Sequence, residues 1–199
     1  MPDPRPARTR GRLIAAAHDL IVEKGVAGLR IAEITEQAGV ALGSFYNHFA
    51  TKEELVEAVA LQTLTSLADE IVTADPSDGD AGVVAITALR RFVRLGYDDV
   101  AFARLLVNLS RGEELFLAAI SPYARTALSR AAAEGVFAIE DVDVAVTTIV
   151  GGGLALIRRI LDGELHPDAD AVYARAVLLG FGVAPGEAAR IIGLSDPPP

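Results

Sequence analysis

The segment from residue 30 to residue 54, RIAEITEQAGVALGSFYNHFATKEE, constrains the fold of this chain more than any other stretch. It begins with apolar residues at i, i+3 and i+7, the spacing of one helix face, which are Ile31, Ile34 and Ala38. Gly39 follows, where a left-handed residue can end a helix at low cost. A second short helix is predicted over residues 42–48, and Thr51 with Glu54 forms a T-x-x-E capping box that begins a third helix.

The order helix, glycine-containing turn, helix is that of the helix-turn-helix motif, whose second helix can enter a DNA major groove. The string AGVALGSFYNHFATKEEL, residues 38–55, is more specific than a bare motif. From Thr9 to about Val59 the chain resembles the N-terminal DNA-binding domain of the TetR family of transcriptional repressors. The remaining residues resemble that family only in length and helical pattern.

The resemblance implies that the second short helix lies in the major groove. Gly43 would let the backbone approach DNA closely, and Ser44 and Asn47 would hydrogen-bond to base edges or phosphates. His48 and Lys52 would hold phosphates, Lys52 beside a helix N-terminus. The implied DNA-binding residues are Arg30, Leu42, Gly43, Ser44, Tyr46, Asn47, His48 and Lys52. For each of them the alternative is an ordinary surface side chain.

Three positions depart from the family pattern. Arg30 stands where family members often have a Thr that caps the first helix of the motif and bonds to phosphate. An Arg can contact phosphate but cannot cap. Ala41 and Leu42 replace a Ser-Lys type of start, so the second helix lacks a cap and one cation. This difference concerns affinity more than function, and Leu42 suggests an apolar contact with a base.

The net charge of −9 is unevenly distributed along the chain. Residues 1–55 hold seven basic and seven acidic side chains, whereas residues 56–199 hold 11 bases and 20 acids and so carry the whole −9. A local basic patch, and not the total charge, governs phosphate contact. The acidic remainder also suppresses loose binding to the DNA backbone.

Several classes of chemistry are excluded or disfavoured by the composition. The chain has no cysteine, which rules out disulfides, thiol catalysis and Cys-ligated zinc. Its three histidines, His18, His48 and His166, are far apart and lie in no metal-binding spacing. No nucleophile elbow or phosphate loop occurs. We therefore expect no cofactor, no metal site and no enzymatic activity.

The N-terminal residues contain no apolar stretch, so no secretory signal is expected. The run 144–157 is free of charge but shorter than the roughly 20 residues that span a bilayer. The expected location is the cytoplasm, without a membrane partner.

An all-α fold is predicted, with helices over residues 9–24, 31–38, 42–48, 52–73, 81–95, 100–109, 113–134, 141–162, 168–182 and 185–192. Pro122 should kink or split its helix. The domains would be a flexible arm (1–8), a three-helix DNA-binding domain (9–55), a helical effector-binding and dimerisation domain (56–194) and a tail (195–199). The long helix over residues 52–73 would join the two domains.

In the TetR family the second domain binds a small-molecule effector and dimerises through its last two long helices. The polar and aromatic residues of the middle helices suggest a ligand pocket formed by Phe92, Phe102, Arg104, Asn108, Phe116 and Tyr123, although such aromatics are more often simply core. The glycines at 151–153, inside an apolar helix, suggest close approach of another helix or local unwinding. The predicted homodimer interface comprises Ile149, Gly152, Gly153, Leu156, Val172 and Leu179.

The resulting hypothesis is a homodimeric, DNA-binding transcriptional repressor that a small-molecule effector releases from a palindromic operator. The identity of the effector does not follow from the sequence. One alternative is a DNA-binding or interaction protein without an effector, although an acidic chain with a large helical domain suits that function poorly. A second alternative is an enzyme with a helical fold.

Overall fold

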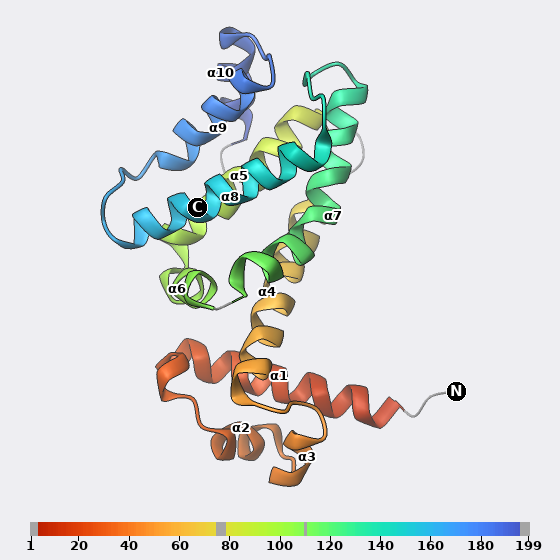
Figure 1. The fold of residues 1–199 in the computed structure, drawn as a ribbon, viewed down its shortest axis with the longest axis vertical. Coiled ribbons are helices and arrows are strands. Elements are labelled where there is room, and N and C mark those ends of the chain that lie inside the picture. The colour runs from red at the N-terminus through yellow and green to blue at the C-terminus, as the bar shows by residue number, and fades with distance from the viewer. Residues whose placement is uncertain (1–3, 75–78, 110, 196–199) are drawn as a thin grey trace. The chain divides into compact units, whose positions relative to one another are not determined.

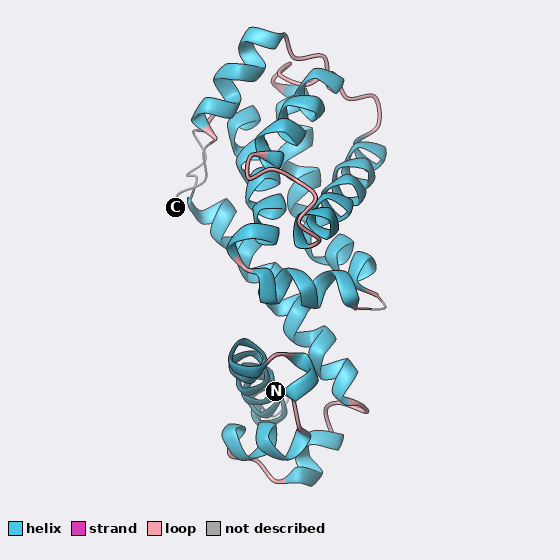
Figure 2. Ribbon diagram, turned by 90° about the vertical axis from the view of Figure 1, so that its left-hand side faces the viewer, coloured by secondary structure: helices cyan, strands magenta, loops and turns pink. Residues whose placement is uncertain are grey.

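The computed structural model of the chain describes residues 4–74, 79–109 and 111–195. In this part of the chain every secondary-structure element is a helix, which confirms the all-α prediction (Figure 2). The chain divides into two compact units, Met1–Thr63 and Leu64–Pro199. The boundary lies inside a single helix, α4 (Lys52–Ala74), and therefore further along the chain than residue 55, where the domain boundary was expected.

In its described residues the first unit is helical and includes the beginning of α4 (Figure 1). Its elements are α1 (Pro4–Lys24), the 3-10 turn η1 (Val26–Gly28), α2 (Ile31–Ala38) and α3 (Leu42–Tyr46). The predicted apolar stripe of α1 is buried throughout and comprises Leu13, Ile14, Ala17, Leu20 and Ile21. Because α1 packs against α2, the buried stripe of α1 forms part of the core that supports the helix-turn-helix motif.

Two boundaries in the first unit differ from the predictions. Helix α1 begins at Pro4, so the expected flexible arm is wrong for residues 4–8, and residues 1–3 lie outside the described part. Proline is well suited to the first position of a helix, because its fixed φ is helical and its missing N–H would have no partner there. Helix α3 ends at Tyr46 instead of His48, and Asn47 is its C-terminal cap.

The second unit is a bundle built around α5 (Ala81–Asp98). The other helices are α6 (Val100–Asn108), α7 (Gly112–Ala133), α8 (Val142–Leu161), α9 (Ala169–Gly180) and α10 (Pro185–Leu194). Helix α5 packs against each of these five, most extensively against α8 and α7, which also pack against each other (Figure 1). The core of this unit therefore lies between α5, α7 and α8.

Helix α7 contains Pro122 and yet is one continuous helix, so of the two predicted outcomes, a kink or a split, the split is wrong. A proline removes one backbone hydrogen bond but does not by itself end a helix whose apolar face is buried. That face includes Phe116, Leu128 and Ala131.

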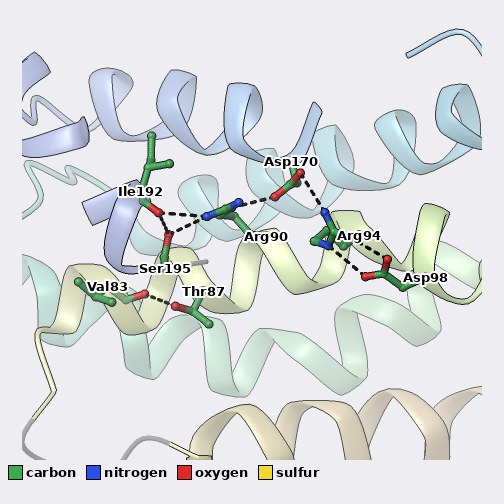
Figure 3. A network of polar contacts seen from close by, with 8 residues as sticks. All are labelled: Val83, Thr87, Arg90, Arg94, Asp98, Asp170, Ile192 and Ser195. Atoms are coloured by element: carbon green, nitrogen blue, oxygen red, sulfur yellow. Dashed lines mark hydrogen bonds and ion pairs between the residues drawn. The ribbon is translucent and has the colours of Figure 1, made fainter. Parts of the chain in front are cut away.

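Helix α9 is held to α5 by a buried ion pair, and α10 by a hydrogen bond from the same arginine (Figure 3). The Arg90 Nε donates to the Asp170 Oδ2 of α9 over 2.8 Å, and its Nη1 donates to the Ile192 carbonyl of α10 over 3.0 Å. Ser195 is buried, and its hydroxyl donates to the same Ile192 carbonyl. The expected tail is therefore wrong for Ser195, and residues 196–199 lie outside the described part.

Helix α8 is the one helix among the described residues that is long and apolar enough to cross a membrane. Its buried residues pack against α5 and α7, as those of a core helix in a globular domain do. The length and the apolar composition of α8 are therefore explained by its packing inside the helical bundle.

Candidate DNA-binding surface and ligand cavity

The turn between α2 and α3 depends on Gly39. Its backbone is left-handed, with φ 61° and ψ 42°, and its N–H donates to the Glu36 carbonyl over 3.0 Å. The Arg12 Nη2 of α1 donates to the Gly39 carbonyl over 3.2 Å, and a Cβ at position 39 would lie 2.6 Å from that nitrogen. The left-handed backbone therefore favours glycine at this position, as predicted for this turn, whereas the flexible end of Arg12 could move away from a Cβ.

Two aromatic side chains, Phe45 within α3 and Phe49 just after it, anchor this helix, and much of its remaining surface is exposed. Phe45 and Phe49 are fully buried, with ring centroids 5.8 Å apart. Leu42 and Tyr46 are 53% and 58% exposed, although the Tyr46 ring also contacts Phe45 edge-on, with ring centroids 5.2 Å apart. The structure thus presents the early part of α3 to solvent.

Six of the eight predicted DNA-binding residues lie on α3 or directly after it, and none of the eight is buried. Arg30, Gly43 and Asn47 are exposed, and a Cβ at Gly43 would meet no atom within 4 Å. Ser44 and His48 are half-buried. Neither α2 nor α3 has a side-chain cap at its N-terminus, as expected from Arg30 and Ala41.

The N-terminus of α4 has the predicted capping contact. The Glu54 N–H donates to the Thr51 Oγ1 over 3.1 Å. In return the Glu54 carboxylate accepts from the Ala50 N–H over 2.7 Å, one residue earlier than in a standard capping box. Lys52 is half-buried at this terminus, and its Nζ donates to the Leu29 carbonyl over 3.4 Å.

Arg10 and Arg12 of α1 also reach the motif, which the sequence reasoning missed. The Arg10 guanidinium lies 5.0 Å from the ring centroid of Phe49, and Arg12 bonds to the Gly39 turn. Their positive charge was visible in the sequence, but no role was predicted for the faces of α1 on which they lie. These contacts place two cations of α1 beside the helix-turn-helix motif.

The second unit contains a cavity of ≈ 100 Å³ between α4, α5, α7, α8 and α9. Its walls are formed almost entirely by apolar side chains. Phe92 of α5 and Phe116 of α7 are stacked, with ring centroids 4.0 Å apart and an interplanar angle of 29°. Phe137 and Phe181 form a second aromatic pair in the lining, 5.5 Å apart.

Three of the six predicted pocket residues line this cavity, namely Phe92, Phe116 and Tyr123. The other three do not line it. Phe102 is buried elsewhere in the bundle, and Arg104 and Asn108 are exposed on α6. Arg104 donates to the Leu161 carbonyl, and Asn108 donates to the Arg104 carbonyl. Their polar groups are thus used at the surface of the bundle.

The glycines of α8 allow close packing within one protomer. A Cβ at Gly153 would lie 2.5 Å from the Phe92 Cε1, and a Cβ at Gly152 would lie 2.3 Å from the Tyr173 hydroxyl oxygen. Gly153 is buried, so its assignment to a dimer interface is corrected. Ile149 lines the cavity, which gives it a role inside the protomer that was not expected. The helix is continuous at these positions, so the alternative of local unwinding is wrong.

The other predicted interface residues leave an apolar surface on α8 and α9. Val172 and Leu179, two turns apart on α9, are 61% and 43% exposed. Val144 of α8 is also exposed, and Leu156 is half-buried.

Within residues 4–74, 79–109 and 111–195, no three His, Cys, Asp or Glu side chains lie close enough together to hold a metal ion.

Two family profiles match the chain and together include both units. Residues 13–59 match the profile described as bacterial regulatory proteins, tetR family, and residues 78–193 match the Tetracyclin repressor-like C-terminal domain. The chain belongs to the TetR family. TetR-family proteins are DNA-binding transcriptional regulators and not a family of enzymes, in agreement with the sequence-based interpretation.

Curated HTH-type transcriptional regulators match over part of the chain. The regulator CymR of Pseudomonas putida is 50% identical over 54 residues, which are 27% of this chain and 27% of CymR. The regulator Mb2936c of Mycobacterium bovis is 33% identical over 118 residues, 56% of this chain and 58% of that protein. The chain thus spans well under two thirds of the length of these curated relatives.

Solved TetR-family structures match over nearly the whole chain. The crystal structure of RolR in complex with resorcinol has a TM-score of 0.81 and 33% identity, and covers 98% of this chain and 97% of RolR. RolR without ligand has a TM-score of 0.80 and 30% identity, and covers 94% of this chain and 97% of RolR. The fold of each unit is therefore that of the TetR family.

Proposed function

We propose that this TetR-family regulator is a homodimeric repressor that a small-molecule effector, bound in the cavity of the second unit, releases from a palindromic operator. The observation that carries the proposal is the apolar cavity in the same chain as an exposed helix-turn-helix face. Pockets of this type, concave and mostly apolar, are the usual sites of small-molecule ligands. The protein acts in the cytoplasm, where its DNA is found.

Recognition of DNA rests on the exposed face of α3. Asn47 and Ser44 provide hydrogen-bonding groups for base edges, and Tyr46 provides a ring for a thymine methyl and a hydroxyl for phosphate. Lys52 and His48 hold phosphates on either side of the groove. Arg30 adds a further cation on the phosphate backbone, and Leu42 an apolar contact with a base.

Dimerisation through α8 and α9 is supported by the exposed apolar residues of α9. Val172 and Leu179 lie on one face of that helix, two turns apart, and Leu156 and Gly152 of α8 belong to the same proposed interface. A two-fold dimer presents two helix-turn-helix motifs to two half-sites of the DNA. The centres of the half-sites lie about one turn of the DNA helix, or a multiple of it, apart. A single helix-turn-helix would read only one half-site.

Effector control is supported by the continuity of α4. This helix begins at the capped terminus beside the DNA-reading face and contributes Leu67 and Ala68 to the cavity wall. An effector that changes the tilt of α4 would change the separation of the reading heads. The effector acts only through its different affinities for the two arrangements, so DNA and effector must weaken each other by the same factor. A factor of roughly 5–150 is ordinary for such coupling.

RolR, which shares the fold over the whole chain, binds resorcinol, and we extend this to a small aromatic effector for the present chain. The test begins with selection of bound duplexes from a random pool by the full-length protein, followed by footprinting. We expect a protected palindromic site and release of the DNA on addition of the effector. Equal binding to the selected and to random DNA would refute sequence-specific repression. Specific binding that no small aromatic weakens would favour the alternative of an effector-independent regulator.

A further inference from the structure

We infer that the cavity of the second unit selects a neutral, single-ring aromatic molecule with at most one hydroxyl group, and that this hydroxyl donates a hydrogen bond to Tyr123. The inference rests on the proposed function and deepens it, since it defines the chemistry of the effector. It also separates this chain from RolR, whose ligand resorcinol carries two hydroxyls.

The size of the cavity limits the ligand to one ring. Its volume of ≈ 100 Å³ is smaller than the engineered apolar cavity of about 150 Å³ that binds benzene in another protein. A benzene-sized ring therefore requires a modest adjustment of the wall. Two fused rings would require the stacked side chains of Phe92 and Phe116 to separate. Since both rings are almost fully buried, that movement would disrupt the core.

The walls exclude charge. Among the described residues that line the cavity, Tyr123 alone has a polar side chain, and none is charged. A carboxylate or ammonium group would lose its hydration without a compensating partner, which is a large penalty. Four phenylalanines in the lining, Phe92, Phe116, Phe137 and Phe181, favour a flat ring by stacking or edge-to-face contact.

The geometry at Tyr123 sets both the number and the direction of ligand hydrogen bonds. The Tyr123 hydroxyl donates to the Asp69 Oδ1 over 2.6 Å, and this hydrogen bond raises the pKa of Tyr123, so the phenol stays protonated. A phenolic oxygen has one proton to donate and also accepts. Because the proton is directed to Asp69, a ligand hydroxyl meets Tyr123 as an acceptor and has to be the donor.

A second ligand hydroxyl has no comparable partner in the lining. Burying an unsatisfied hydroxyl lowers affinity by about 5- to 150-fold. We therefore expect phenol to bind more tightly than resorcinol by a factor in this range. A site with hydrogen-bonding partners for two hydroxyls would instead bind resorcinol more tightly than phenol.

The experiment measures binding of phenol, toluene, resorcinol and 1-naphthol to the full-length protein by calorimetry, without DNA. Phenol and toluene are expected to bind, resorcinol to bind more weakly, and 1-naphthol not to bind. Tyr123→Phe should weaken phenol by about 2- to 13-fold, the effect of one neutral hydrogen bond, and leave toluene unchanged. Tyr97→Phe, the same change at a tyrosine of α5 outside the cavity lining whose hydroxyl donates to the His166 carbonyl, is the matched control and should alter neither.

A second variant tests the size limit. Phe116→Leu removes one ring of the stacked pair and enlarges the cavity, so it should admit 1-naphthol while it still binds toluene. Binding of 1-naphthol to the unchanged protein, or resorcinol at least as tight as phenol, would overturn the inference. Those results leave the proposed repression intact, since operator binding is measured separately. Conversely, phenol binding that leaves operator affinity unchanged would support the ligand chemistry and refute effector control.

Discussion

The ring of Phe92 lies directly on the backbone of α8 at Gly153, so closely that a Cβ at position 153 would come within 2.5 Å of the Phe92 Cε1. Phe116 stacks on the same ring at 4.0 Å. The position of Phe92, and with it one wall of the cavity, is therefore set by the absence of a side chain on the neighbouring helix.

Gly153→Ala should displace Phe92 and weaken the binding of every ring-shaped ligand, at a stability cost of about 1–3 kcal/mol, as for other overpacked cores. The matched control is Gly151→Ala on the same helix, where a Cβ would meet no atom within 4 Å. This control should be neutral or stabilise by about 0.5–1 kcal/mol, because alanine is the better helix former. Urea unfolding and toluene binding measure both effects. Equal behaviour of the two variants would contradict the role of Gly153.

Asp170→Ala should destabilise the second unit by about 3–5 kcal/mol, because it leaves the buried Arg90 guanidinium without its carboxylate. The side chains of Arg90 and Asp170 are 7% and 1% exposed. Arg159→Ala removes an exposed pair with Glu164 and should cost at most about 1 kcal/mol. Urea unfolding of the three proteins gives the comparison. A loss below that of the exposed control would show that the pair does not hold α9 and α10 to α5.

Asp80 should make stability depend on acidic pH. A hydrogen bond from Arg190, at 2.5 Å, lowers the pKa of Asp80 below its ordinary value of 3.8, and the backbone N–H groups of Val83 and Gly82 add to the effect. Because the folded pKa is lowered, the stabilisation is complete above the unfolded value and is lost as the pH falls through the folded value. Asp80→Asn keeps an N-terminal cap on α5 but removes the charge. The difference in unfolding free energy between the two proteins should narrow below pH 3.8. A difference that stays constant between pH 7 and pH 3 would contradict this assignment.

Leu179→Glu should convert the proposed dimer into monomers with weakened operator binding, because it places a charge in the apolar face of α9. Leu194→Glu is the matched control, since Leu194 is 60% exposed on α10, outside the proposed interface. Light scattering gives the mass of each variant. Loss of the dimer in both, or in neither, would remove this interface from consideration.

Asn47→Ala should relax base preference more than it lowers non-specific DNA binding. Lys52→Ala should weaken binding to all sequences and reduce the salt dependence by about one phosphate contact. Affinities for the selected operator and for random DNA, each at several salt concentrations, separate the two effects. An equal loss on both DNAs for Asn47→Ala would show that Asn47 does not read bases.

Local signals in the sequence were sufficient for most of the secondary structure. The stripe on α1, Gly39 at the turn and the Thr51 cap each depend on residues within a few positions of one another. Such patterns reflect helix geometry directly, and the structure confirms all three. The start of α1 was missed because Pro4 and Pro6 suggested an irregular arm, although proline is favourable in the first turn.

The cavity could be predicted only in part, because its walls come from helices far apart in the chain. Phe92 and Phe116 were recognisable as apolar aromatics, but nothing local distinguished them from Phe102, which is buried elsewhere. Polar character misled the prediction at Arg104 and Asn108, which bond to backbone carbonyls. A glycine in the sequence also does not show whether the helix that packs against it belongs to the same protomer. Gly153 is an example, because it packs against Phe92 of its own protomer.

Helix α4 contains the boundary between the two units within its own backbone, between Thr63 and Leu64. Each residue of an α-helix advances the chain by about 1.5 Å and turns it by about 100°. One inserted residue at this boundary would therefore turn everything that follows by about 100° around the helix axis, whereas about seven, close to two full turns, would nearly restore the original phase. A chimeric regulator could join the helix-turn-helix unit of one such protein to the second unit of another. The junction in this helix would then have to keep the rotation of the two units around the helix axis unchanged.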